Sequence, residues 1–346
     1  MFEPGEFTGL RDQLKDKISQ VTPRSFDRLA LEVFRFQAEY NRVYADYLKY
    51  LHCNPEQVNA LHEIPFLPVS LFKSHKIVTG PEVTGARVFE SSGTTGTESS
   101  RHYVSDTDLY ERLSTRIFER RYGPLTGFHI LALLPSYLER NNSSLVYMVQ
   151  HFMKLSGSQF SGFYLDDFGA LNRKLAAIKE AEDGRKVLLI GVTFALLDWA
   201  DHFEKSALAG EGLPDIIVME TGGMKGRRRE MLRQEVHDLL SEKLAVAAVH
   251  SEYGMTEMVS QAYARKEGIF SYSDSLKVLI RDITDPFSIR ADGQTGGINI
   301  IDLGNLGSCS FIETSDIGKS DDGSGTFEIL GRLDNSDIRG CNLLYV

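Results

Sequence analysis

Four short segments of the chain carry side chains that could bind a nucleotide. The first covers residues 91–100, of which seven are Ser or Thr and two are Gly. Glycine lets the backbone approach an anion, and hydroxyl and amide groups donate hydrogen bonds to it, so this run predicts a phosphate-binding loop. No Gly-Lys-Ser/Thr sequence closes it, which distinguishes it from a Walker A loop. An ordinary flexible loop is the alternative interpretation.

The second segment, residues 251–257, supplies an aromatic ring, a hydroxyl group and a carboxylate close together. It directly follows a predicted strand that ends at His250. In open α/β sheets, ligands bind beyond the carboxyl ends of the strands. Tyr253 could stack on a base, Thr256 could contact a phosphate and Glu257 could hold a magnesium ion.

Two further segments, residues 313–316 and 331–334, could bind a sugar. Asp316 lies at the end of a predicted strand, and a short carboxylate there can accept hydrogen bonds from vicinal sugar hydroxyl groups. Arg332 could donate to a ribose or phosphate oxygen. The four segments therefore form an ordered set of groups suited to a nucleotide.

Alternating helices and strands must position these segments. Apolar periodicity and turn residues predict helices over 106–122, 144–155, 168–182, 194–203 and 226–244, and strands over 88–90, 129–134, 186–190, 216–220 and 245–250. A Gly222-Gly223 turn follows the strand at 216–220. This alternation is typical of an α/β fold with largely parallel pairing.

The two ends of the chain differ from its middle in the elements that they predict. Apolar residues spaced by three and four over 33–51 predict a helix within a helical segment at 1–60. An extended segment with two prolines follows at 64–73. Beyond residue 270, short strands and Gly/Asp turns predict a small β-rich subdomain at about 270–330.

The composition narrows the class of protein. The chain has 346 residues, 42% of them hydrophobic, and a net charge of -10. It can bury a large core, and its acidity argues against nucleic-acid binding and fits a cytoplasmic enzyme. We see no signal peptide and no apolar stretch near the ~20 residues of a membrane helix. Three cysteines without a CxxC pair argue against a disulfide framework or a zinc site.

In this order the four segments resemble the adenylate-forming superfamily of acyl-CoA synthetases, luciferases and adenylation domains. The signatures of that superfamily are a Ser/Thr/Gly phosphate loop, Tyr-Gly-x-Thr-Glu, Thr-Gly-Asp and Gly-Arg-x-Asp. The first two match here, the third has Ser315 in place of Gly, and the fourth matches at Gly331, Arg332 and Asp334. Four motifs in order are a much more specific signal than one.

The resemblance narrows to the acyl-protein synthetase (LuxE-type) branch, the ATP-dependent component of bacterial fatty-acid reductase. It rests on residues 64–68, 72–73, 135–140, 143–145 and 339–344 and extends over about 60–346. It implies an α/β adenylate-forming core at 61–330, with two sheet-and-helix lobes and the β-rich subdomain. Residues 331–346 would form a hinge motif and a short tail, and the mobile C-terminal domain of most superfamily members would be absent.

The resemblance also implies a two-step reaction that uses ATP and Mg²⁺. A carboxylic acid, expected to be a fatty acid, becomes an acyl-adenylate and then a thioester. It places Thr256 and Arg101 in catalysis, Glu257 at the metal, Asp334 at the hinge and Cys341 as the acyl acceptor. The residues it implies for nucleotide binding are Ser92, Gly93, Thr94, Thr95, Gly96, Gly222, Gly223, Tyr253, Gly254, Asp316 and Arg332.

Several positions depart from the family pattern. The usual Pro-Lys after the phosphate loop is replaced by residues 98–101, where Glu98 either points outward or reaches magnesium and Arg101 replaces the cation. Without the C-terminal-domain lysine, Lys73, Arg101 or Lys225 must supply a positive charge, or a partner protein must. The alternative for Cys341 is a buried packing residue.

Three alternatives for the function stay open. An acid–CoA or acid–carrier-protein ligase would use the same chemistry with another thiol. A nucleotide-binding, non-catalytic subunit of a reductase complex would bind ATP without turnover, and a phosphotransferase lacks its usual motifs. An acyl-CoA reductase or an acyl carrier is the expected partner. The basic run 225–229 is either a solvated helix start or a carrier docking site.

Overall fold

The computed structural model describes residues 4–81, 85–91, 99–135, 142–203, 210, 212–223 and 231–333. The chain divides into two units. The first unit comprises Met1–Arg87, Gly93–Asp106 and Ser271–Val346, and the second comprises Val88–Ser92 and Thr107–Phe270. The two ends of the chain therefore share one unit, and the middle of the chain forms the other.

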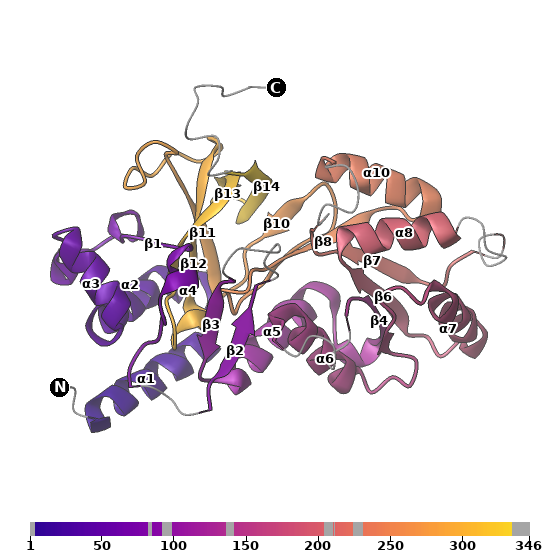
Figure 1. Cartoon of the computed structure of the whole chain (residues 1–346), viewed down its shortest axis with the longest axis horizontal. Helices are drawn as coiled ribbons and strands as arrows, with labels where there is room; N and C mark the ends of the chain where they lie inside the picture. The colour runs from indigo at the N-terminus through magenta and orange to yellow at the C-terminus, as the bar shows by residue number, and fades with distance from the viewer. Residues whose placement is uncertain are drawn as a thin grey trace. The chain divides into compact units, whose positions relative to one another are not determined.

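A mainly parallel sheet forms the centre of the second unit (Figure 1). Its order is β10-β9-β8-β7-β6-β4-β5, with parallel pairing from β8 to β5 and antiparallel pairing of β9 with β8. The strands are β4 (Phe128–Leu133), β5 (Gly162–Phe163), β6 (Lys186–Gly191), β7 (Ile216–Glu220), β8 (Val249–Tyr253), β9 (Ala262–Ala264) and β10 (Ile269–Ser271). Every residue of β4 is buried, as expected for a strand covered on both faces.

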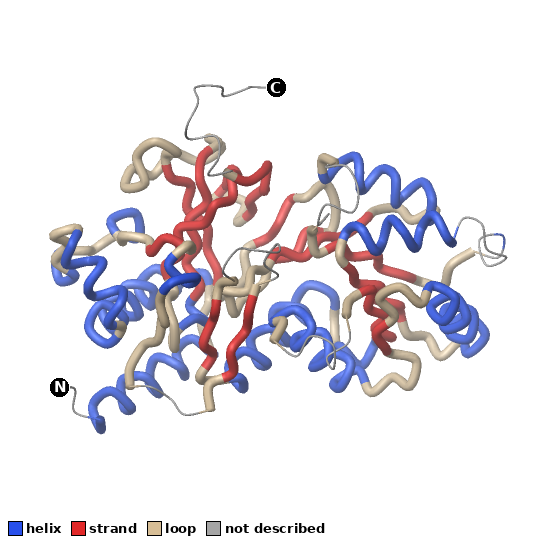
Figure 2. Tube along the Cα trace, viewed as in Figure 1, coloured by secondary structure: helices blue, strands red, loops and turns tan. Residues whose placement is uncertain are grey.

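Helices provide that cover. Figure 2 shows the strands of this unit between layers of helices, with α8 and α10 on one face and α5 and α6 on the other. The helices are η3 (Leu125–Gly127), α5 (Thr107–Tyr122), α6 (Ser144–Ser156), α7 (Phe168–Ala181), α8 (Thr193–Phe203) and α10 (Arg233–Leu244). Trp199 of α8 is fully buried, and its indole N–H donates to Asn172 Oδ1 of α7 at 2.9 Å.

The first unit joins N-terminal helices to an antiparallel sheet. Its strands follow the order β11-β12-β13-β14, and β1 pairs in parallel with β13. The strands are β1 (Leu67–Pro68), β3 (Arg101–Val104), β11 (Leu276–Arg281), β12 (Gly296–Asp302), β13 (Phe311–Asp321) and β14 (Thr326–Arg332). The helices are α1 (Pro4–Ser19), α2 (Pro23–Tyr40), α3 (Arg42–Tyr50), η1 (Pro55–Gln57), η2 (Leu61–Glu63), α4 (Leu71–Ser74) and η4 (Leu303–Asn305). β2 (Arg87–Glu90) carries the chain from the first unit into the second.

Helix α2 packs against the sheet of the first unit. The rings of Phe34 and Phe311 meet edge to face with centroids 5.8 Å apart. Gln37 is fully buried and its amide spans the turn after β12, donating to the Asn305 carbonyl at 2.9 Å and accepting from the Ser310 N–H at 2.8 Å. A buried amide with both ends satisfied fixes the position of the helix on the turn.

The structure confirms the α/β alternation and corrects three local predictions. The helix predicted over 33–51 is two helices, because Asn41 is extended and its side chain accepts from the Tyr44 N–H to start α3. The extended segment at 64–73 ends in the short helix α4. The strand predicted at 245–250 begins only at Val249, since Ala245 ends α10 in a left-handed conformation, so Tyr253 lies within β8.

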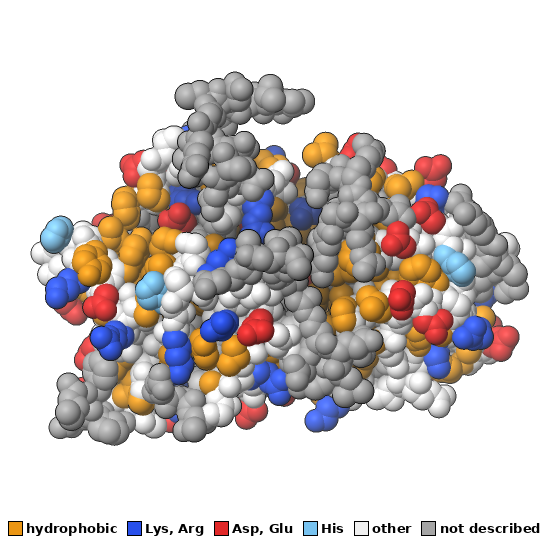
Figure 3. Space-filling view, in the orientation of Figure 1, with side chains coloured by type: hydrophobic (Ala, Val, Ile, Leu, Met, Phe, Trp, Pro, Cys, Tyr) orange, Lys and Arg blue, Asp and Glu red, His pale blue; other side chains and the backbone are white. Residues whose placement is uncertain are grey.

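The described surface carries charges of both signs. Within the described ranges, no helix is long and apolar enough to cross a membrane. On the face shown in Figure 3, acidic and basic side chains lie interspersed on each unit. This mixture agrees with the modest net charge of -10.

Candidate active site

A cavity of about 230 Å³ lies in the second unit at the carboxyl ends of its parallel strands. All of the described residues that line it belong to this unit. They are Glu90, Tyr110, Leu134, Pro135, Ser143, Ser144, Leu145, Val146, Met148, Val192, Thr221, Gly222, Gly223, Glu252, Gly254, Met255, Thr256, Met258, Ser260 and Gln261. The chain leaves β4, β6, β7 and β8 at this edge, which is where open α/β sheets bind ligands.

The amino end of α6 forms one wall of the cavity. Ser143 caps the helix, because its hydroxyl accepts from the Val146 N–H at 3.4 Å. The remaining first-turn amides and the helix dipole give this end a partial positive charge, which favours a carboxylate or a phosphate nearby.

The Gly222-Gly223 turn forms another wall. Both glycines have positive φ, +75° and +88°, a conformation that other residues adopt at a cost. The Gly222 N–H donates to Glu220 Oε2 at 2.6 Å, and its carbonyl accepts from the Thr193 N–H at 3.1 Å. The turn is therefore held rigidly in the shape that only glycine favours.

Glu220 is the buried centre of the contacts behind this turn. Arg233 Nε lies 3.2 Å and His237 Nε2 3.5 Å from Oε1, and the Thr193 hydroxyl donates to Oε2 at 3.2 Å. Burial alone would raise the pKa of Glu220, but the hydrogen bond from His237 and the Arg233 charge lower it to about 2. Glu220 is thus a fully paired carboxylate that positions the turn.

Glu252 lies in the cavity wall with no such pairing. It is 8% exposed, and within the described residues its side chain makes no hydrogen bond. Its Oε1 lies only 2.6 Å from where a Cβ on Gly254 would stand, so the missing side chain at Gly254 makes room for the carboxyl. Burial, and then the charge of Glu220, raise the pKa of Glu252 to about 8, which leaves it protonated at neutral pH.

Gln261 is a second incompletely paired group in the same wall. It is 4% exposed, and its Nε2 donates to the Val259 carbonyl at 2.7 Å, which fixes the orientation of the amide. Its Oε1 has no hydrogen-bond partner in the described part of the chain. Glu90, by contrast, accepts from Asn142 Nδ2 at 2.6 Å.

The structure brings four predicted residues to the cavity: Gly222, Gly223, Gly254 and Thr256. Tyr253 and Glu257 are buried beside it, at 8% and 6% exposure, but do not line it. The Tyr253 ring packs on Phe270 with centroids 5.9 Å apart. The predicted residues Ser92, Gly93, Thr94, Thr95, Gly96, Asp334 and Cys341, and the basic run 225–229, lie outside the described residues.

Two predicted sugar-binding residues meet in the first unit. Asp316 of β13 and Arg332 of β14 are directly paired across the strands, with Arg332 Nε 3.8 Å from Asp316 Oδ1. The Arg332 side chain is 72% exposed and that of Asp316 14%. Arg101 is the exposed first residue of β3, and Lys73 lies in α4.

Neither described cysteine has the surroundings of a reactive thiol. Cys309 is fully buried, which raises its pKa to about 12, and burial also raises the pKa of Cys53. A nucleophilic cysteine needs exposure and a lowered pKa. The structural interpretation of both residues therefore agrees with their surroundings.

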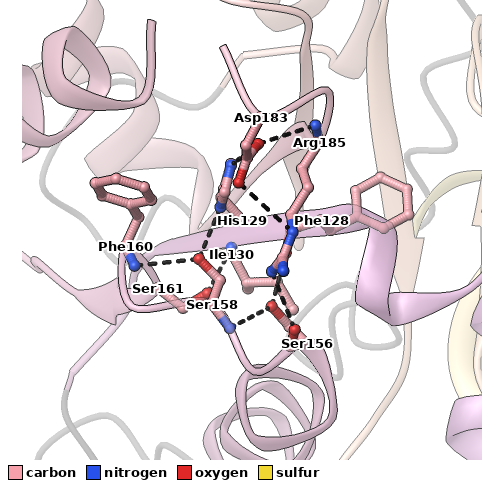
Figure 4. A network of polar contacts seen from close by, with 9 residues as sticks. All are labelled: Phe128, His129, Ile130, Ser156, Ser158, Phe160, Ser161, Asp183 and Arg185. Atoms are coloured by element: carbon pink, nitrogen blue, oxygen red, sulfur yellow. Dashed lines mark hydrogen bonds and ion pairs between the residues drawn. The ribbon is translucent and has the colours of Figure 1, made fainter. Parts of the chain in front are cut away.

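The opposite end of the parallel strands carries a polar network (Figure 4). His129, near the start of β4, contacts Ser158 Oγ through Nδ1 at 2.7 Å and Asp183 Oδ1 through Nε2 at 3.0 Å. The Ser156 hydroxyl donates to the Phe128 carbonyl at 2.6 Å. This network ties the end of α6 to the strands, and His129 does not line the cavity.

Sequence reasoning did not single out Glu220, Glu252 or Gln261 as site residues. A signal for Glu252 is its place within β8, where four of five residues are buried. Gln261 carried no comparable signal, because its unpaired oxygen depends on the tertiary structure. A groove of about 530 Å³ in the first unit, bordered by Leu10, Phe36 and Tyr40, contains none of the predicted site residues.

Comparisons with known proteins agree with the sequence motifs. The family model "Acyl-protein synthetase, LuxE" matches residues 19–345. A long-chain-fatty-acid–luciferin-component ligase of Aliivibrio fischeri is 25% identical over 92% of this chain and 86% of its own length. The corresponding ligase of Vibrio harveyi is 24% identical, over 91% and 86%.

Solved structures share the fold. A 2-hydroxyisobutyryl-CoA ligase structure matches 92% of this chain and 78% of its own, with a TM-score of 0.67 and 14% identity. MatB from Rhodopseudomonas palustris matches 72% of this chain with a TM-score of 0.51 and 17% identity. The match spans 49% of the MatB chain, about half of its length. These likenesses establish the adenylate-forming α/β fold predicted above.

Proposed function

Because the chain belongs to the acyl-protein synthetase (LuxE) family, and is thus an acid–thiol ligase that activates a carboxylic acid, we propose that it joins a fatty acid to a thiol through an acyl-adenylate made from ATP. The observation that carries this proposal is the family match over residues 19–345 together with the cavity at the strand ends. The cavity combines apolar walls with the amino end of α6, which suits an acid with an apolar chain.

The proposed reaction has two steps. A carboxylate oxygen of the acid attacks the α-phosphorus of ATP, and the bond to the bridging oxygen breaks, so that pyrophosphate leaves with the electron pair. A thiolate then attacks the acyl carbon, the bond to the AMP oxygen breaks, and the thiol proton goes to solvent. Catalysis consists mainly of positioning and of stabilising charge on phosphate oxygens.

Each of these steps needs groups that bind the nucleotide and the acid. We propose that Thr256 donates to the α-phosphate or the substrate carboxylate and that the Gly222-Gly223 turn flanks the adenine. Asp316 and Arg332 would bind the ribose, and the loop at 92–96 would hold the β- and γ-phosphates. Support comes from the rigid turn behind Glu220 and from the strand pairing of Asp316 with Arg332.

Glu257 is the proposed magnesium residue. Among the described residues, no group of three or more His, Cys, Asp or Glu side chains could hold a metal ion. A lone carboxylate nevertheless fits Mg²⁺, which proteins usually bind through one or two carboxylates together with substrate phosphates. The ion would neutralise charge on the triphosphate.

The acyl acceptor is proposed to be Cys341. Both described cysteines have raised thiol pKa values, which leaves Cys341 as the thiol of this chain best suited to the role. CoA or a carrier protein is the alternative acceptor, and an acyl-CoA reductase is the proposed partner that consumes the thioester. A Cys341→Ala variant that still forms a stable acyl-protein bond would overturn the proposal for Cys341.

The decisive experiment is acid-dependent ATP–pyrophosphate exchange with magnesium, across acetate, aryl acids and short to long fatty acids. Exchange with one class of chain would support adenylation and name the substrate class. A protein that binds ATP but shows no exchange with any acid would instead support a non-catalytic, nucleotide-binding subunit.

A further inference from the structure

The cavity at the strand ends is lined from both faces of the parallel sheet. Its Gly222-Gly223 turn rests on α8, because the Thr193 N–H donates to the Gly222 carbonyl at 3.1 Å. Helices α5 and α6, which lie on the opposite face of the sheet (Figure 2), contribute Tyr110 and Met148 to the lining. A ligand whose nucleotide part lies at the glycine turn would therefore direct its other end toward α5 and α6.

The side chains that α5 and α6 contribute to the lining include three that are large and buried. Tyr110 and Val146 are each 2% exposed, and Met148 is 1% exposed. Leu134, directly after β4, is also 1% exposed and lines the cavity. Such surroundings favour a hydrocarbon chain, because each methylene group that leaves water gains free energy. The α5–α6 side of the cavity therefore suits the chain of an acid.

Tyr110 is held in place by a hydrogen bond and by two neighbouring rings. Its hydroxyl donates to the carbonyl of Ser144, the first residue of α6, at 3.1 Å. Its ring packs against those of Phe89 and Tyr147, with centroids 5.8 Å away in both cases. Neither Phe89 nor Tyr147 is among the described residues that line the cavity, so the Tyr110 ring stands between the cavity and these two rings.

We propose that Tyr110 closes the α5–α6 end of the cavity and thereby limits the length of the acid chain that the enzyme accepts. This inference rests on the proposed function and names a specificity-determining residue of the same site. The chain of the longest accepted acid ends against the Tyr110 ring. A longer chain would have to displace the ring from its hydrogen bond and its ring contacts, and forcing extra methylene groups into a packed interior is destabilising.

The test is ATP–pyrophosphate exchange with the even-numbered straight-chain acids from acetic to stearic acid. The wild-type kcat/KM should rise about fourfold with each added methylene group, the equivalent of its burial. At one chain length it should then fall by about tenfold or more, because a longer chain overfills the cavity. Tyr110→Ala should move this fall to longer acids by at least one even-numbered step, since the space vacated by the ring joins the cavity.

Tyr147→Ala is the matched control. It removes a ring of the same kind from the same aromatic cluster but leaves the Tyr110 hydrogen bond and the contact with Phe89 in place. The chain-length limit should therefore stay where it is in the wild type. Val146→Phe adds bulk on the same side of the cavity and should move the limit to shorter acids. If Tyr110→Ala does not melt cooperatively, Val146→Phe decides the inference.

A binding measurement separates this inference from the proposed function. Isothermal titration of the same acids without ATP should show the same limit and the same shifts in the variants. A wild type that accepts every acid up to stearic acid, a limit that neither Tyr110→Ala nor Val146→Phe moves, or an equal shift in Tyr147→Ala would overturn the inference while adenylation stands. Absence of exchange with every acid would overturn the proposed function, and the titration would still decide the inference.

Discussion

The two ends of the parallel strands in the second unit differ in how completely their buried polar side chains are hydrogen-bonded. At the amino end of β4, His129 is 1% exposed and both of its ring nitrogens have partners. At the carboxyl end, Gln261 is nearly as buried, at 4% exposure, yet within the described residues its Oε1 has no hydrogen-bond partner. Complete pairing suits a residue that stabilises the fold, whereas an unpaired group in a cavity wall can still pair with a ligand.

The comparison shows that burial alone does not distinguish a structural polar residue from a functional one. Glu220 makes this plain, because it lies at the cavity end but is fully paired and therefore belongs with His129. If this distinction holds, substitutions of paired residues should change the free energy of unfolding, and substitutions of unpaired ones should change ligand selection.

The largest effect is expected for Thr256→Val at the cavity end. Loss of the hydroxyl should lower kcat of the exchange reaction by about 10²–10³, the usual result of removing one donor to a developing charge. The melting temperature should change little. Steady-state exchange kinetics would check this, with Thr295→Val, on an exposed turn of the first unit, as control. A stable variant with wild-type kcat would remove Thr256 from catalysis.

The next largest effect is expected for His129→Ala at the amino end of β4. The substitution leaves Ser158 without its ring partner and removes the ring packed edge-on against Phe160, so the free energy of unfolding should fall by about 2–4 kcal/mol. Urea denaturation would measure it, with the exposed His62→Ala as control. Loss of exchange activity in the still-folded variant would show that His129 has more than a structural role, which contradicts the comparison.

A smaller, pH-dependent effect is expected for Glu252→Gln. The folded-state pKa of Glu252 is raised to about 8, so the unfolded state binds fewer protons than the folded state above pH 4.5. Its contribution to stability is therefore complete below pH 4.5 and declines as the pH rises toward 8. Glu252→Gln should remove this decline and be more stable than wild type at pH 8, by about 1–3 kcal/mol.

Denaturation curves from pH 5 to pH 8.5 would test this sign. The exposed Glu242→Gln on α10 should keep the wild-type slope. Parallel slopes for Glu252→Gln and the wild type would show that Glu252 ionises normally and would weaken the comparison at its carboxyl end.

The smallest effect on stability is expected for Arg332→Gln in the first unit. Because the Arg332 side chain is 72% exposed and 3.8 Å from Asp316, the free energy of unfolding should change by no more than about 0.5 kcal/mol. The KM for ATP should rise several-fold if Arg332 binds the ribose. A large loss of stability with an unchanged KM would assign this pair to the structural class instead.

The sequence predicted the elements of the second unit well, because strands and helices there have clear apolar periods and turn residues between them. It placed the Gly222-Gly223 turn after a predicted strand and Thr256 within a motif, and both lie in the cavity wall. It could not show that Asn41 divides a helix, since the N-cap hydrogen bond competes with an uninterrupted apolar pattern. Nor could it reveal the unpaired groups at Glu252 and Gln261, which depend on contacts absent from a linear pattern.

The discontinuous first unit has a consequence for synthesis of the protein on the ribosome. Phe34 of α2 and Tyr44 of α3 are fully buried in the finished unit, and both rings pack on Phe311. Phe311 follows Tyr44 by 267 residues (311 − 44), so the aromatic faces of α2 and α3 stay uncovered by it while the intervening residues are translated. The second unit, contiguous from Thr107 to Phe270, can fold during this interval. Until Phe311 is made, the nascent chain therefore exposes the apolar faces of these two helices.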